Sequence, residues 1–246
     1  MLNKKKYNEI IDEKMNVNMP YSYLDKHKER FIFINNYINK LYGTNKQNIK
    51  ILDYGSHTGI MGVLLLEAGY DVECCDLKEV IDKYEVNYKT NKIKYDFIIS
   101  NDKLPYENEQ FDLVIFTEIL EHLHESPINK LNDIKRIIKP GGYLLLTTPN
   151  VMNLENKIKF FFNVNIYQDI YRYCYNPRYS LHYREYSKKD LKKLLIDFLK
   201  FKKIKFKYFN YAGGRTLLLK MIQKFSFMIS SLIPSLRYCI LVLAKK

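Results

Sequence analysis

Two carboxylates and an imidazole recur at helical spacing directly after an apolar run. Glu118, Glu121 and His122 stand at positions i, i+3 and i+4, and residues 111–117 before them are strongly apolar. On a helix, side chains at these intervals share one face. Carboxylate oxygens and an imidazole nitrogen that converge can bind a divalent cation. The spacing therefore predicts a catalytic or metal-binding group at the end of a buried strand.

A second chemical pattern surrounds a glycine turn. The apolar residues 49–52 predict a buried strand, and Gly55 and Gly59 follow it before apolar residues resume at helical spacing. Asp76 ends the next apolar run, about 20 positions after the turn. A strand, a glycine turn and a helix can hold a nucleotide-like ligand, and the later carboxylate can accept hydrogen bonds from ribose hydroxyls.

Further motifs extend this pattern over about residues 30–199. In chain order they are Leu52-Asp53-Tyr54-Gly55, Thr58-Gly59, Leu104-Pro105-Tyr106, Phe111-Asp112-Leu113-Val114, Leu120-Glu121-His122, Lys139-Pro140-Gly141-Gly142 and Thr148-Pro149-Asn150. Together they resemble the motifs of the class I S-adenosylmethionine (SAM)-dependent methyltransferases. The usual first motif of that family has a third glycine where this chain has His57.

The resemblance implies a fold and a cofactor. The implied fold is α/β: a Rossmann-like, seven-stranded, mostly parallel sheet with an antiparallel last strand, helices on both faces and an aromatic-rich cap. The implied cofactor is SAM, and Asn101 or Asp102 would meet its adenine amino group. The expected cofactor-binding residues are Asp53, Gly55, Gly59, Asp76, Leu77, Asn101, Asp102 and Thr117.

The Glu-x-x-Glu-His pattern resembles the metal-binding helix of the ubiquinone-pathway O-methyltransferases and of the small-RNA 2′-O-methyltransferases. In the latter group a second histidine follows in a loop before a helix, and His182 occupies that place. The expected metal ligands are Glu118, Glu121, His122 and His182, for Mg²⁺ or, because of the imidazoles, Zn²⁺ or Mn²⁺. The alternative needs no metal: Glu121 bonds a backbone amide, and His122 acts as the base or orients the substrate. Glu121 and His122 are thus also the expected catalytic residues.

Composition fits an enzyme domain. The chain has 246 residues, and we expect one methyltransferase domain over 1–246, with a helical segment at 1–45 and a cap insert at about 150–186. Its net charge of +13 could attract nucleic acid or an anionic membrane surface. The lysines are scattered along the chain, which favours a compositional bias instead.

Cysteine usage and the N-terminus predict a cytoplasmic location. The four cysteines have no C-x-x-C spacing, and Cys74 and Cys75 are adjacent on a predicted buried strand, which fits a reducing compartment. The N-terminus lacks the apolar run of a signal peptide, and no apolar stretch approaches the roughly 18 residues of a membrane span. The apolar residues 217–233 could dock peripherally on the inner face of a membrane, although such stripes are more often core.

Periodicity gives the expected elements. Residues 1–20 are loose or a short helix, and residues 23–41 form a helix. The expected strands are 49–52, 70–75, 94–100, 111–117, 143–148, 201–209 and 238–244. Ser187 is the expected N-cap of a helix over 188–199, with Asp190 in the capping-box position, and residues 217–233 form a long helix that Pro234 stops.

Aromatic residues crowd the segment after the fifth strand. Phe160, Phe161 and Phe162 precede a tyrosine-rich stretch with Tyr167, Tyr171, Tyr173, Tyr175 and Tyr179. Such a surface could grip an aromatic ring or a sugar, or could pack on itself.

The expected function is transfer of a methyl group from SAM to a hydroxyl oxygen of a small molecule or glycan. A hydroxyl is a poor nucleophile at neutral pH, so a base or an acidifying metal is needed. RNA 2′-O-methylation is the alternative that the charge and the metal-like pattern favour, although the chain has no recognisable RNA-binding module. A SAM-binding module without catalysis is the third hypothesis, because His57 replaces a glycine.

Overall fold

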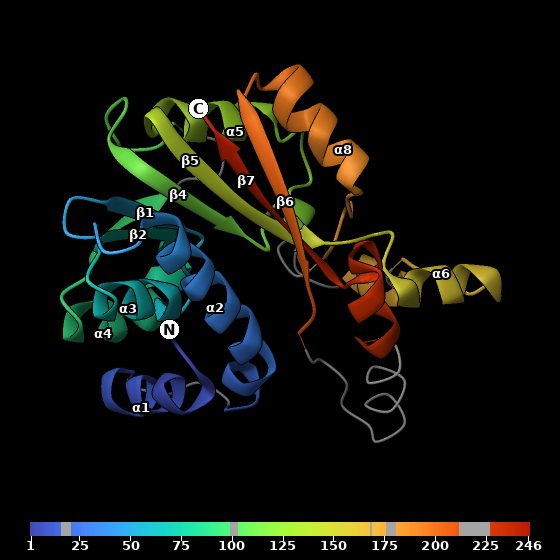
Figure 1. Cartoon of the computed structure of the whole chain (residues 1–246), viewed down its shortest axis with the longest axis horizontal. Coiled ribbons are helices and arrows are strands. Elements are labelled where there is room, and N and C mark those ends of the chain that lie inside the picture. Colours follow the sequence, from blue (N-terminus) through green and yellow to red (C-terminus); the bar gives the residue numbers. More distant parts are fainter. Residues whose placement is uncertain (16–20, 99–102, 168, 176–180, 212–226) are drawn as a thin grey trace. The chain divides into compact units, whose positions relative to one another are not determined.

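A computed structural model describes residues 1–15, 21–98, 103–167, 169–175, 181–211 and 227–246 (Figure 1). The chain divides into two compact units. The first comprises Met1–Phe116, Asn132–Leu144 and Lys246, and the second comprises Thr117–Leu131 and Leu145–Lys245. The prediction of a single domain with a cap insert stays a prediction.

Seven strands form one mixed sheet in the order β3-β2-β1-β4-β5-β7-β6. They are β1 (Lys50–Tyr54), β2 (Asp71–Leu77), β3 (Lys94–Ile98), β4 (Phe111–Thr117), β5 (Ile138–Pro149), β6 (Lys203–Phe209) and β7 (Cys239–Lys245). Strand β1 pairs in parallel with β2 and β4, β2 pairs in parallel with β3, and β7 runs antiparallel to β6. The predicted α/β fold, with a mostly parallel seven-stranded sheet and an antiparallel last strand, is confirmed.

Four helices belong to the first unit: α1 (Lys4–Lys14), α2 (Tyr21–Tyr42), α3 (Ile60–Glu67) and α4 (Lys78–Thr90). The side chain of Asn3 caps α1 by accepting from the backbone N–H of Lys6 at 2.9 Å. Of the two alternatives expected for the N-terminal segment, the short helix is therefore the one that forms at Lys4–Lys14. Residues 60–65 of α3 are all buried, so this helix is apolar on every side until its last two residues. It begins directly after the glycine turn, as predicted.

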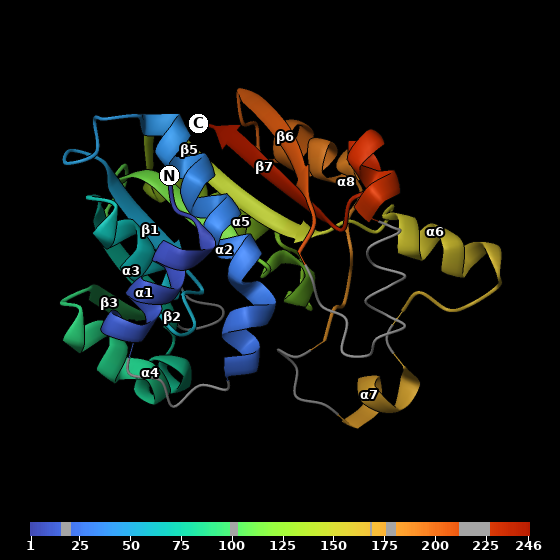
Figure 2. The same ribbon diagram turned by 60° about the horizontal axis from the view of Figure 1, so that its bottom comes forward.

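The second unit contains shorter helical elements: η1 (Leu120–His122), α6 (Leu154–Phe161), α7 (Ile170–Tyr175), α8 (Lys188–Lys192), η3 (Lys193–Phe198) and η4 (Pro234–Leu236). Figure 2 shows α6 and α7 most clearly. Helix α5 (Ile128–Ile137) has residues in both units. The aromatic side chains of α6 and α7 are largely exposed, among them Phe160, Tyr171 and Tyr175. Their role as a substrate cap stays a prediction.

The capping box predicted at Ser187 is confirmed. The backbone N–H of Asp190 donates to Ser187 Oγ at 3.2 Å, and the backbone N–H of Ser187 donates to Asp190 Oδ2 at 3.0 Å. The helix that starts there continues from α8 into the π-helical η3, which ends at Phe198. The start of the helix over 188–199 therefore follows from local hydrogen bonding.

Some predicted features lie outside the described residues. These include Asn101, Asp102, Tyr179 and the first part of the long helix expected over 217–233. Residues 227–232 of that segment are helical, and Pro234 opens η4. None of the helices that can be described has the length and apolar composition needed to cross a bilayer.

Candidate functional site

The glycine turn is fastened to the end of β2. The backbone N–H groups of Gly55 and Ser56 both donate to the carbonyl oxygen of Cys75, at 2.8 and 3.2 Å. Gly55 and Gly59 have φ values of +71° and +79°, which side chains rarely tolerate. The two glycines are therefore needed for the path of the turn, as the motif predicts.

The Asp76 carboxylate holds this turn through two backbone groups. His57 N–H donates to its Oδ2 and Leu77 N–H donates to its Oδ1, both at 2.7 Å. The side chain is buried, and burial raises its pKa, although these two backbone bonds act in the opposite direction. Each carboxylate oxygen can accept a second hydrogen bond. Asp76 therefore positions the turn and can still accept from ribose hydroxyls.

Asp53 is a buried carboxyl with an unused acceptor. It is 2% exposed, and its Oδ2 makes no hydrogen bond with any residue that the structure describes. Burial, reinforced by the negative charge of Asp76, raises its pKa to about 8, while the positive charge of Arg30 opposes this rise. A cationic ligand at this position would stabilise the ionised carboxylate. SAM carries a sulfonium and an ammonium group, so these residues fit the expected cofactor.

His57 occupies the place of the missing glycine in the left-handed backbone region, with a φ of +50°. Its ring lies 5.3 Å from the ring of Tyr23 on α2 and 5.0 Å from that of Tyr84 on α4, between centroids. The hydroxyl of Tyr88 donates to the His57 carbonyl at 2.8 Å and lies 2.9 Å from Ser56 Oγ. Burial lowers the pKa of His57 to about 4, so the ring is neutral at pH 7. The turn thus keeps its path with a side chain at this position.

Sequence reasoning missed two residues of this region, Arg30 and Tyr88. Arg30 is a buried cation on α2 whose charge acts on both Asp53 and His57. A lone arginine on the apolar side of a predicted helix is a signal that could have found it. Nothing in the sequence distinguishes Tyr88 from the other 21 tyrosines.

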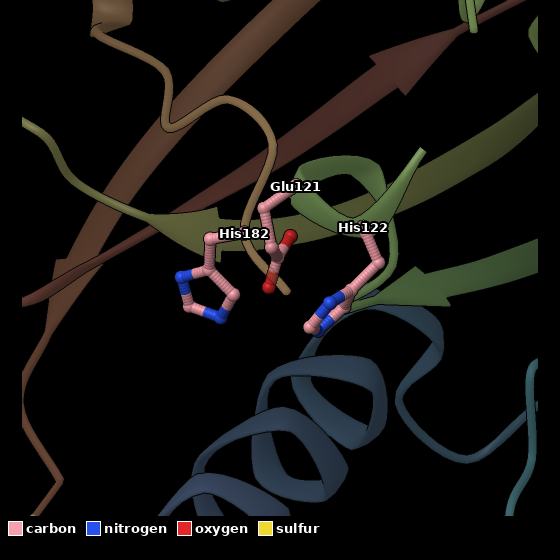
Figure 3. A group of neighbouring side chains, drawn as sticks. All are labelled: Glu121, His122 and His182. Atoms are coloured by element: carbon pink, nitrogen blue, oxygen red, sulfur yellow. The ribbon is translucent and has the colours of Figure 1, made fainter. Parts of the chain in front are cut away.

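In the second unit, Glu121, His122 and His182 converge (Figure 3). One ligand atom from each lies within 4.8 Å of the others. Glu121 is 1% exposed, and the hydroxyl of Thr148 donates to its Oε2 at 2.9 Å. The loop that carries His182 is fixed beside η1, because Tyr183 N–H donates to the Glu121 carbonyl at 2.7 Å. Three of the four expected metal ligands are therefore brought together.

Both imidazoles are oriented through Nδ1. His122 Nδ1 lies 2.8 Å from the carbonyl oxygen of Leu181, and His182 Nδ1 lies 3.1 Å from Glu185 Oε1. A carbonyl oxygen only accepts, so His122 Nδ1 carries the proton and its Nε2 is left with a lone pair. Metal-ligating histidines usually make this kind of second hydrogen bond. Burial lowers the pKa of His122 from its ordinary value, which keeps the ring neutral at pH 7.

The prediction that Glu118, Glu121 and His122 lie on one face of a helix is wrong. Glu118 has a φ of +55°, and only Leu120–His122 form a short 3₁₀ turn. The reason is that Glu118 N–H still donates to the Thr147 carbonyl at 2.9 Å, which extends the sheet pairing past the end of β4. The Glu118 carboxylate instead accepts from the hydroxyls of Thr147 at 2.8 Å and Tyr211 at 3.2 Å. Its role as a metal ligand stays a prediction.

Two other predicted cofactor residues end strands. Leu77 is the last residue of β2 and donates its backbone N–H to Asp76. Thr117 is the last residue of β4 and is half-buried. Their contacts with SAM stay predictions.

Comparison with known proteins identifies the family. A family model described as a methyltransferase domain matches residues 25–198, so the chain belongs to that family. The resemblance to the class I SAM-dependent methyltransferases is confirmed. One curated relative, the ubiquinone biosynthesis O-methyltransferase of Hydrogenovibrio crunogenus, is 31% identical over 108 residues. This match covers 42% of the chain and 44% of the relative, so the chain spans less than half the length of that enzyme.

Solved structures show the same fold. A SAM-dependent methyltransferase from Archaeoglobus fulgidus superposes with a TM-score of 0.59 at 17% identity, covering 92% of this chain and 100% of that one. Phosphoethanolamine N-methyltransferase 2 of Haemonchus contortus, solved with SAM, has a TM-score of 0.60 at 14% identity and covers 100% of this chain and 60% of its own. At these identities the likeness establishes architecture alone.

Proposed function

We propose that this protein transfers a methyl group from SAM to a hydroxyl oxygen of its acceptor. The family membership supports methyl transfer, and the curated relative named above is an O-methyltransferase. SAM supplies a methyl group that the positive charge on sulfur already activates. The protein must then align the acceptor and remove its proton.

The first unit would bind SAM. Asp76 accepts the ribose hydroxyls with its remaining acceptor capacity, and the ionised form of Asp53 complements the positive charge of the cofactor. Gly55 and Gly59 let the backbone of the turn approach the ligand. Arg30, a buried cation whose charge reaches Asp53, is suited to the methionine carboxylate of SAM.

The second unit would handle the acceptor oxygen. The observation that carries this assignment is the convergence of Glu121, His122 and His182 with both Nδ1 atoms already engaged. Mixed carboxylate and imidazole donors suit Mn²⁺ or Zn²⁺ as well as Mg²⁺. Such a cation would lower the pKa of a bound hydroxyl. Thr148, Leu181 and Glu185 hold the three donors in place.

A second candidate uses His122 alone as the general base. Its neutral ring, with the proton on Nδ1 and a lone pair on Nε2, can accept the hydroxyl proton. The Leu181 carbonyl would then stabilise the imidazolium that forms. In this version His182 is a neighbour, 4.9 Å away between ring centroids, that orients the substrate.

The relative's name and the donor set of the site both support a hydroxyl acceptor. The curated relative is named for ubiquinone biosynthesis, which suggests a phenolic hydroxyl as the acceptor. A glycan hydroxyl would also have to lose its proton during the transfer. A ribose 2′-hydroxyl of RNA is the alternative, because the net charge of +13 suits a polyanion. A SAM-binding protein without turnover is the remaining alternative.

Methyl transfer can be tested with tritiated SAM and three probe acceptors: catechol, a methyl glycoside and a short RNA. We expect transfer to catechol or the glycoside, loss of transfer with chelator and recovery with added Mn²⁺. His122→Ala and His182→Ala should abolish transfer without weakening SAM binding. His124→Ala is the matched control, because this histidine lies on the same segment outside the donor group.

The outcomes separate the versions. Transfer that resists chelator and fails only in His122→Ala would assign the reaction to a general base. Transfer to RNA alone would assign the acceptor to nucleic acid. SAM binding with no transfer to any probe, even with added metal, would contradict the O-methyltransferase proposal for these acceptors.

A further inference from the structure

The helix that follows His182 has an outer face made of lysines, which we call the basic face. Its members are Lys188, Lys189, Lys192 and Lys193, all exposed on α8 and η3. On the same helix Leu191, Leu194 and Leu195 are buried. The helix is therefore amphipathic, with an apolar side in the core of its unit and a cationic side in solvent.

The charge of the basic face is only weakly neutralised, by the electrostatic interaction of Lys193 with Asp190. Within the described chain none of the four lysines has an acidic partner within ion-pair distance. Asp190, the nearest acid in sequence, is engaged by Ser187 and lies 3.8 Å from Arg184. Residues 188–207 contain nine lysines, two aspartates and no arginine. The expectation that the lysines are scattered does not hold for this segment.

The same unit exposes an apolar tip at the end of α6, formed by Phe160, Phe161 and Phe162. These side chains are 78%, 83% and 69% exposed. In both views α6 extends away from β5, β6 and β7 (Figures 1 and 2). Three consecutive exposed phenylalanines form a contiguous apolar patch, and such patches on a protein surface mark sites of interaction with a protein or a membrane.

We propose that the basic face and the phenylalanine tip dock this protein on an anionic lipid bilayer. Lysine clusters on amphipathic helices are attracted to anionic headgroups, and phenylalanine inserts at the interface with the acyl chains. The charge complementarity selects this partner. Nucleic-acid surfaces favour arginine, which binds phosphate with two parallel hydrogen bonds. The basic face contains lysines only, and Phe198 at the end of the same helix is a further exposed apolar ring that could insert between the headgroups.

Vesicle co-sedimentation of the full chain tests the proposal. The probes are vesicles of phosphatidylcholine alone and of phosphatidylcholine with phosphatidylglycerol. We expect binding to the anionic vesicles only, decreasing as salt rises. The variant K188E/K189E/K192E/K193E should weaken partitioning by at least about 100-fold, because each lysine near the surface contributes about a factor of five. F160S/F161S/F162S should retain the salt-sensitive attraction but lose binding at higher salt.

A matched control distinguishes the effect of the basic face from the effect of the protein's net charge. K6E/K26E/K40E/K103E changes the charge by the same amount at exposed lysines of the first unit, and it should bind like the wild type. The proposal is overturned if the wild type stays in the supernatant with both vesicles, or if the control loses as much binding as the basic-face variant. Binding to a short RNA without binding to vesicles would replace the bilayer with nucleic acid.

Discussion

Asp53 gives the cofactor site a pH dependence that can be measured without knowing the acceptor. Burial raises its pKa to about 8, whereas the ordinary value of 3.8 holds in the unfolded chain. Between these two values the folded state binds a proton that the unfolded state has lost. The free energy of unfolding therefore falls as pH rises through this window. Asp53→Asn removes the titration and keeps the size of the side chain.

The pH range between the two pKa values of Asp53 fixes the size of the change in the free energy of unfolding. Each pH unit inside this range changes the free energy of unfolding by about 1.4 kcal/mol, so raising pH from 5.5 to 7.5 should cost about 2.7 kcal/mol. Burial lowers the pKa of His27 to about 3 and that of His57 to about 4, and these histidines act in the opposite direction below pH 6.5. Their contribution cancels when wild type and Asp53→Asn are compared at the same pH.

Urea unfolding without SAM at pH 5.5, 6.5 and 7.5 measures this difference. Relative to Asp53→Asn, the wild type should lose about 2–3 kcal/mol of stability over the range. Calorimetric titration of SAM in two buffers of different ionisation enthalpy gives a second reading. Because SAM is cationic, its binding should release about one proton from Asp53 at pH 6.5. Stability curves that run parallel for the two proteins, with no proton release, would refute the reasoning.

Three further predictions concern the framework of the site. Tyr88→Phe removes the hydroxyl that donates to His57 O at 2.8 Å, so it should cost about 1–2 kcal/mol in urea unfolding and weaken SAM binding; unchanged affinity would show that the turn needs no such support. Gly142→Ala places a Cβ 2.8 Å from the Asp112 carbonyl oxygen and 3.0 Å from that of Lys139, so it should cost about 1–3 kcal/mol in thermal unfolding; unchanged stability would contradict this. Ser187→Ala should cost about 1 kcal/mol through the lost capping box, and Ser187→Thr should cost less.

The fold was predictable because local patterns and tertiary structure agree. The apolar runs at 111–117 and around 50–54 are too short for a typical helix and are rich in β-branched and aromatic residues, and Gly55 ends the run at 50–54. Ser187 with Asp190 located a helix start to the residue, because a capping box satisfies its backbone groups locally.

The site was less predictable where distant backbone groups decide the conformation. The Glu-x-x-Glu-His spacing matches a helix, but pairing of Glu118 N–H with Thr147 prevents one from starting there. The convergence of His182 with Glu121 depends on a loop 61 residues further along the chain, which periodicity cannot place. The contact of Tyr88 with His57 likewise comes from the packing of α4 on the turn.

Calorimetric titration of SAM into the wild type, Asp76→Ala and His182→Ala tests the central claim most directly. The proposed function predicts one SAM site, weakened by about 1–3 kcal/mol in Asp76→Ala through lost ribose hydrogen bonds and unchanged in His182→Ala. Thermal unfolding of each variant checks that Asp76→Ala remains folded. The absence of SAM binding by the wild type, or full affinity in a folded Asp76→Ala variant, would contradict the assignment of this turn to the methyl donor.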